Sequence, residues 1–162
     1  MESTASSSGR FGAHDARRRP VVYLIGSLRT ERIPHFANLL EAATGYEVFD
    51  SWYAAGPNAD DCLRDYENLR GRSIVEALRG HAATHVYEFD KSHIDRADAS
   101  VLLMPAGKSA HTELGYTVGT GKPGFICFDE QAPERLDVMW NFATDIAWTL
   151  DELVPMLKRR LG

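Results

Sequence analysis

The chain has 162 residues, 44% of them hydrophobic and 25% charged, and a net charge of −5 at pH 7. This length allows one domain with a buried core, and the negative charge argues against a nucleic-acid polymer as partner. No apolar run approaches the ~20 residues of a membrane span, and Cys62 and Cys127 lack the spacing of a metal or redox motif, so we expect a cytoplasmic protein that uses no membrane, metal or cofactor.

The first nineteen residues differ in composition from the rest. Met1–Gly12 is rich in Ser, Gly and Ala, and Arg17–Pro20 adds three arginines. The apolar run that follows, Val21–Ile25, is too short for the core of a secretory signal. We therefore predict a disordered, solvated tail over residues 1–19 and a single domain over residues 20–162.

From residue 20 onward, apolar runs alternate with segments of helical periodicity. The runs predict strands at Val21–Ile25, Tyr46–Asp50, Ala99–Met104 and Gly124–Phe128. The periodicity and its Gly stops predict helices at Ile33–Thr44, Asp61 to about Leu78, Lys91–Ala97 and Ser109–Thr120, with a loop at Ala54–Asp61 and one or two closing helices after Trp140. This alternation predicts an α/β fold, a three-layer, doubly wound (flavodoxin- or Rossmann-like), mostly parallel sheet of about five strands with helices on both faces.

Two turns that follow predicted strands carry polar residues suited to an anion. Gly26, Ser27 and Arg29 come directly after the first strand, where backbone N–H groups and a guanidinium can hold a phosphate. The alternative is a tight turn with a surface arginine. After the third strand, Ser109 is expected to cap a helix whose first turn holds Glu113, either as a reactive carboxylate or as a partner of the helix dipole.

Two further segments have weaker signals. Asp95–Asp98 leads into the third strand, where aspartates often only end a helix or turn. Asp50 and Trp52 follow the second strand and reach the same edge of the sheet. Trp52 can stack on a base or, equally, pack beneath the Gly56–Pro57 loop.

Four motifs together resemble those of the nucleoside 2-deoxyribosyltransferase superfamily, which includes nucleoside 5′-monophosphate N-glycosidases. They are Tyr23–Arg29, Asp95–Asp98, Gly107–Tyr116 and Gly119–Pro123. The resemblance covers roughly Val21–Asp151. It implies an enzyme that cleaves the N-glycosidic bond of a (2′-deoxy)nucleoside or its 5′-monophosphate.

The resemblance also implies a role for each matching residue. Glu113 would be the nucleophile that attacks C1′ of the sugar and forms a covalent glycosyl-enzyme. Tyr23 would orient that glutamate, and Asp98 would protonate or hold the leaving base. Water would then be the acceptor in a hydrolase, or a second base in a transferase.

Departures from the transferase pattern favour a monophosphate and water. Gly107 stands where some transferases carry a second base-binding aspartate, and the loop with Ser27 and Arg29 is closer to the phosphate loop of the hydrolases. Lys108 and Ser109 would add a second phosphate contact. The identity of the base and the choice between ribose and 2′-deoxyribose stay open.

The resemblance further implies a homodimer or larger homo-oligomer with a shared site. In the family, a polar residue near the C-terminus serves the neighbouring subunit's sugar site, and Asn141 and Asp145 are the candidates here. His111 has no second ligand at metal spacing and is expected on the helix surface. The alternative function is a nucleotide-binding or sensing module with little turnover.

Overall fold

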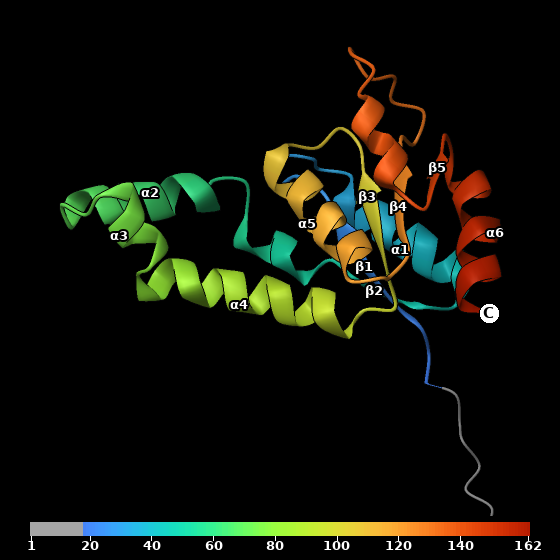
Figure 1. Cartoon of the computed structure of the whole chain (residues 1–162), viewed down its shortest axis with the longest axis horizontal. Coiled ribbons are helices and arrows are strands. Elements are labelled where there is room, and N and C mark those ends of the chain that lie inside the picture. The colour runs from blue at the N-terminus through green and yellow to red at the C-terminus, as the bar shows by residue number, and fades with distance from the viewer. Residues whose placement is uncertain (1–17) are drawn as a thin grey trace, which may run out of the picture.

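Five parallel strands form one sheet in the computed structural model, which describes residues 18–162 (Figure 1). The strands are β1 (Val21–Ile25), β2 (Glu47–Phe49), β3 (Ala99–Leu103), β4 (Gly124–Cys127) and β5 (Asp145–Ala147). Their order in the sheet is β2-β1-β3-β4-β5, with every neighbouring pair parallel. The predicted doubly wound α/β fold is therefore confirmed.

Residues 18–162 also contain six α-helices and two short 3₁₀ helices, all of which lie between strands except the last α-helix, which follows β5. They are α1 (Ile33–Thr44), η1 (Ser51–Ala55), α2 (Ala59–Leu69), α3 (Ile74–Leu78), α4 (His81–Arg96), α5 (Lys108–Gly119), η2 (Val138–Phe142) and α6 (Leu150–Leu161). Among residues 18–162, no helix has the length and apolar character needed to cross a bilayer.

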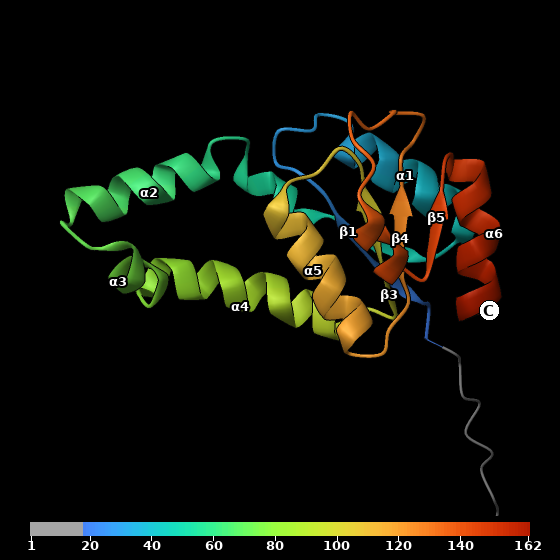
Figure 2. The same cartoon turned by 45° about the horizontal axis from the view of Figure 1, so that its top comes forward.

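The two faces of the sheet have separate cores because side chains alternate along a strand. In β1, Val22 and Leu24 pack toward α1 and α6, whose buried residues belong to the same cluster. Tyr23 and Ile25 point to the opposite face and pack with residues of α4 and α5. Figures 1 and 2 show these helix layers on either side of the sheet. Tyr23 is consequently buried beneath α4 and α5.

The helices between β2 and β3 differ most from the predictions. The stretch expected to be one helix starts earlier, at Ala59, and is broken at Gly71, whose φ of +66° lies in the left-handed region. Ser73 and Glu76 then form a capping box that starts α3. Helix α4 spans 16 residues instead of the short helix expected near its end. Only Ile94 of α4 is buried, so the helix has little of the apolar periodicity that sequence patterns detect.

Helices α2, α3 and α4 form an arm that projects away from the sheet (Figures 1 and 2). The C-terminal part of α4 returns to the domain, and Ile94 packs beside Tyr23 in the core. The strand β5 was not located by the sequence patterns, because its three residues begin with an exposed aspartate and are too few to show a period.

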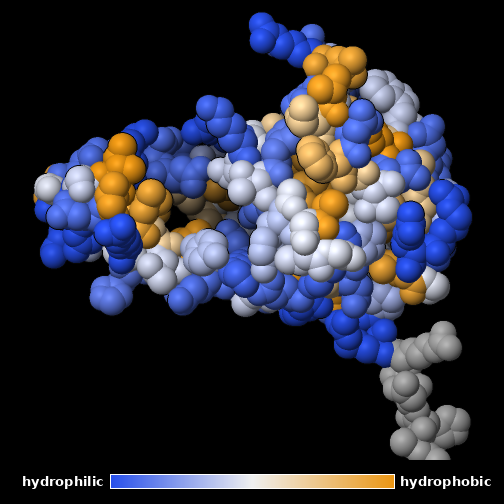
Figure 3. Space-filling model, in the orientation of Figure 1, coloured by the Kyte–Doolittle hydropathy of each residue, from blue (hydrophilic) through white to orange (hydrophobic). Residues whose placement is uncertain are grey.

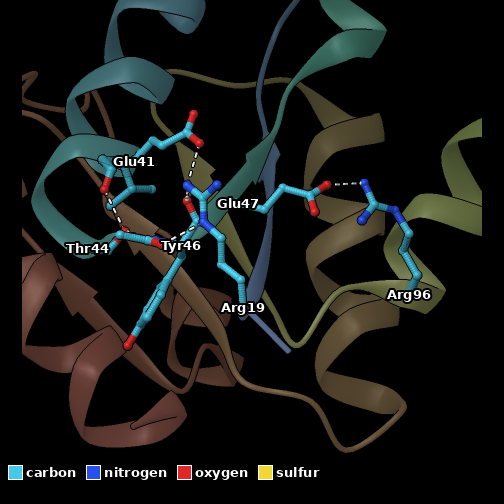
Figure 4. A network of polar contacts seen from close by, with 8 residues as sticks. Arg19, Glu41, Thr44, Tyr46, Glu47 and Arg96 are labelled. Atoms are coloured by element: carbon cyan, nitrogen blue, oxygen red, sulfur yellow. Dashed lines mark hydrogen bonds and ion pairs between the residues drawn. The ribbon is translucent and has the colours of Figure 1, made fainter. Parts of the chain in front are cut away.

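Two arginines that precede β1 bind groups at the amino edge of the sheet, and Figure 4 shows the contacts of Arg19. Arg19 donates to the Gly45 carbonyl at 2.6 Å and to the Glu41 carboxylate at 2.5 Å. Arg18 pairs with Asp98 at 2.8 Å. Residues 1–17 of the predicted tail lie outside the described residues, and the guanidinium groups of its last two residues, Arg18 and Arg19, bind carboxylates and a carbonyl of the domain.

Candidate active site

The candidate site lies at the carboxyl edge of the sheet, between the ends of β1 and β3. The chain leaves these two neighbouring strands in opposite directions, toward β2 and toward β4, and such a point opens a crevice in doubly wound sheets. A cleft of about 290 Å³ is found there. Its walls come from the loop after β1, η1, the arm and the start of α5, and include Gly26, Ser27, Leu28, Arg29, Trp52, Asp60, Asp90, Gly107, Lys108, Ser109 and Glu113.

The loop after β1 forms one wall, as predicted for Gly26, Ser27 and Arg29. A Cβ on Gly26 would stand 2.3 Å from Cδ1 of Ile33, so a larger residue here would require the end of that side chain to move. The Ser27 hydroxyl accepts from the Arg29 backbone N–H at 3.2 Å, which shapes the turn. The Arg29 guanidinium is exposed and lies 3.6 Å from the Asp61 carboxylate.

The start of α5 forms the facing wall. Its N-cap is Gly107, not Ser109 as predicted, and no side chain caps the helix. Because the helix begins at Lys108, Glu113 lies in its second turn and not in the first. The free N–H groups of the first turn are therefore open to an anion in the cleft, with Lys108 and Ser109 beside them.

Two carboxyl groups, those of Glu113 and Asp90, line this cleft. Burial, helped by the nearby charge of Asp90, raises the pKa of Glu113 to about 8. Burial also raises the pKa of Asp90. The pKa of the Tyr23 hydroxyl is raised by burial and then by the charges of Glu113 and Asp90, which places the three groups in one electrostatic cluster. At neutral pH, Glu113 thus keeps its proton.

Asp98 does not belong to this cluster, so the prediction that it converges on Glu113 is wrong. It precedes β3, at the amino edge, where its carboxylate accepts from the Val21 backbone N–H at 2.8 Å and pairs with Arg18. The five residues of β3 separate it from the carboxyl edge by roughly 16 Å at about 3.3 Å per residue. Its function in this fold is to hold the start of β1.

Asp90 was not among the predicted site residues, but it lines the cleft with Glu113, where Asp98 was expected. Helix α4 returns from the arm to the domain before β3 begins, and Asp90, in the second half of the helix, lines the cleft. Asp90 shares a helix face with Ile94 and Ala97, both buried, at spacings of four and seven residues. The sequence signal that could have found Asp90 is a carboxylate on the same helix face as apolar residues. Burying a carboxylate costs free energy, so such a position indicates a candidate functional group.

The remaining predicted residues divide into two groups. Trp52 lies on the cleft wall, and its indole N–H donates to the Leu24 carbonyl at 2.8 Å, which fixes the ring. Asp50, at the start of η1, is not among the residues that line the cleft. Asn141 and Asp145 are exposed and also lie outside the cleft, so any contribution from them would have to reach another subunit.

A second, larger groove of about 800 Å³ adjoins the cleft between α5 and η2. The two share Gly107 and Lys108. His111 lines this groove, donates through Nδ1 to the Gly107 carbonyl at 2.7 Å and accepts at Nε2 from the Trp140 indole at 3.2 Å. Both ring nitrogens of His111 are thus engaged in hydrogen bonds within the protein.

The sequence matches no protein-family model and no curated protein. The resemblance to the nucleoside 2-deoxyribosyltransferase superfamily therefore stays a prediction carried by the motifs. The fold brings two residues of these motifs, Glu113 and Tyr23, into one electrostatic cluster. The third member of the cluster is Asp90, which lies outside the motifs, and not Asp98.

Proposed function

We propose that this protein is an enzyme that cleaves the N-glycosidic bond of a (2′-deoxy)nucleoside 5′-monophosphate, with water as acceptor. The observation that carries the proposal is the pair of carboxyl groups, Glu113 and Asp90, that interact beside a cleft with an anion-binding wall. Glycosidases in general use two carboxyl groups, one ionised and one protonated. Burial raises both pKa values here, so at pH 7 the pair holds at least one proton.

The proposed reaction has two steps. An oxygen of ionised Glu113 bonds to C1′ while the bond from C1′ to the base nitrogen breaks, and the base takes the electron pair together with a proton from Asp90. Water then attacks C1′, gives a proton to Asp90 and releases Glu113. For this step, substrate binding must leave the proton shared by Glu113 and Asp90 on Asp90. The buried Tyr23 hydroxyl can then donate a hydrogen bond to the ionised Glu113.

The 5′-phosphate is assigned to the wall formed by Ser27, Arg29 and the start of α5. Free backbone N–H groups, Lys108 and the Arg29 guanidinium all present positive charge or donors to the cleft there. The exposed pair between Arg29 and Asp61 is weak in water and yields readily to a dianionic phosphate.

A substrate panel tests the proposal directly. The purified protein is incubated with nucleosides and their 5′-monophosphates, in ribo and deoxy forms, and free base is followed by chromatography. Release of base from monophosphates supports the proposal, and transfer to an added second base would identify a transferase instead. Binding of the same nucleotides without any base release would favour the nucleotide-sensing module.

Replacing Arg29 by alanine should weaken cleavage of monophosphates much more than cleavage of nucleosides. We expect kcat/KM to fall roughly 10- to 100-fold for monophosphates and less than about threefold for nucleosides, because a charge-assisted hydrogen bond is lost only from the former. Arg64→Ala is the matched control, since Arg64 is also exposed and also pairs with Asp61 but does not line the cleft. Equal losses for both substrate types would contradict the phosphate assignment.

We further propose that a second copy of the chain covers the groove between α5 and η2. Met139 and Phe142 line it with exposed fractions of 60% and 71%, and the groove opens into the cleft at Gly107 and Lys108. Apolar side chains this exposed beside a site are typical of a subunit interface. A partner there would also bring Asn141 within reach of a neighbouring cleft.

The protein should therefore be a dimer in solution, and Phe142→Asp should make it monomeric. A charge in an apolar interface is left unpaired and destabilises the assembly. Light scattering after gel filtration measures the mass of each species. Leu69→Asp is the control, because Leu69 is 89% exposed on the arm and should leave the mass unchanged. A monomeric wild type would contradict the proposal.

A further inference from the structure

A third hollow, of about 530 Å³, lies between the arm and η1. Figure 3 shows the molecule hollowed between the arm and the rest of the domain. The walls are contributed by α2, α4, η1 and Leu28 of the loop after β1. We name this space the arm hollow, and it is lined by Leu28, Ser51, Trp52, Ala55, Ala59, Asp60, Leu63, Ala82, His85, Val86, Phe89 and Asp90.

The arm hollow opens into the reaction cleft on the side of Asp90. Asp90, Trp52, Leu28 and Asp60 line both spaces. The proposed phosphate wall of Ser27 and the start of α5 lines the cleft and does not line the arm hollow. A nucleotide with its phosphate on that wall and its leaving nitrogen at Asp90 therefore directs its base into the arm hollow.

The size and chemistry of the arm hollow exceed what an unsubstituted base requires. Its volume is nearly twice the 290 Å³ of the cleft. Alanines at three positions leave room in it, and aliphatic and aromatic side chains form most of the remaining wall. A bare pyrimidine or purine would leave these apolar walls in contact with water, whereas an apolar substituent would cover them.

We infer that the base taken by this site is enlarged by an apolar substituent that fills the arm hollow. The inference rests on the proposed function, because it assigns the base side of the same site. Trp52, whose indole is fixed by the Leu24 carbonyl, and Phe89 supply aromatic surface for the rings. Each methylene buried there should strengthen binding about fourfold.

Two matched substrate pairs test the inference. kcat/KM for base release is measured for dAMP against N6-benzyl-dAMP, and for dCMP against N4-benzyl-dCMP. We expect at least one benzylated nucleotide to be cleaved ten or more times better than its parent. Ala82→Phe fills the arm hollow and should reduce that advantage about tenfold or more while changing the parent less than threefold. Ala42→Phe, at an exposed position on α1 away from both spaces, is the control.

A binding measurement separates this inference from the proposed function. Free N6-benzyladenine and N4-benzylcytosine are compared with adenine and cytosine for their ability to raise the melting temperature of wild type and Ala82→Phe. Selective stabilisation of the wild type by a benzylated base supports the arm hollow as its site, even if no nucleotide is cleaved. Cleavage of the parents with no preference for either benzylated partner, in rate or in binding, would uphold the enzyme and overturn the inference.

Discussion

Replacing Glu113 by glutamine should abolish base release and stabilise the fold at the same time. The amide cannot attack C1′, so we expect kcat to fall by roughly 10³-fold or more, as for other nucleophiles. The stability gain follows from the pKa. The folded protein holds Glu113 protonated up to about pH 8, while the unfolded chain ionises it near its ordinary value, 4.5.

The sign of this effect sets the pH window in which it is measured. Below about pH 4 both states are protonated and the substitution changes nothing. Between the two pKa values the unfolded state loses the proton first, so the wild type becomes progressively less stable as pH rises. At pH 8 and above, Glu113→Gln should exceed the wild type in free energy of unfolding by on the order of 3 kcal/mol.

Denaturant unfolding at pH 4, 6 and 8, together with base release, checks both halves of the prediction. Glu88→Gln is the control, because Glu88 is exposed on the arm and lines none of the described cavities. A Glu113→Gln protein that releases base at the native rate would remove Glu113 as nucleophile. A difference in free energy of unfolding between the wild type and Glu113→Gln that does not change with pH would contradict a buried, protonated Glu113.

The second large effect is expected at Asp90 and not at Asp98. Asp90→Asn removes the proposed proton donor, and the loss of a positioned acid typically costs 10²- to 10⁴-fold in rate. Asp98→Asn keeps an oxygen for the Val21 N–H and loses only the exposed pair with Arg18, so activity should change less than about twofold. Base release by the two variants, measured side by side, decides between the positions.

A charged leaving base distinguishes proton donation from a structural effect at Asp90. The base of an N7-methylated guanine nucleotide already carries a positive charge and leaves neutral without a proton. Asp90→Asn should therefore cleave this substrate nearly as well as the wild type does. An equal loss with both kinds of base, or a large loss in Asp98→Asn, would contradict the assignment of Asp90 as the acid.

The comparison of predicted and observed elements shows where local information suffices. The strand Val21–Ile25 and the helix Ile33–Thr44 have the predicted bounds, because an unbroken apolar run and a helix stop at Gly45 are local signals. Gly26, Ser27 and Arg29 line the cleft for the same reason, since they follow the end of a strand directly. The break between α2 and α3 at Gly71 and the three-residue strand β5 had no local sequence signal of comparable strength.

The amino-acid sequence by itself predicted the fold class, the edge of the sheet at which the cleft lies, and Glu113 as a carboxylate at that edge. These depend on periodicity and on residues adjacent to strand ends. Only the tertiary structure decided which aspartate lies near Glu113, because Asp90 lies within α4 and Asp98 follows the end of that helix. Helix α4 passes the cleft on its way back from the arm, whereas Asp98 lies at the amino edge of the sheet, so the aspartate nearer to β3 in sequence is the one farther from the site in space.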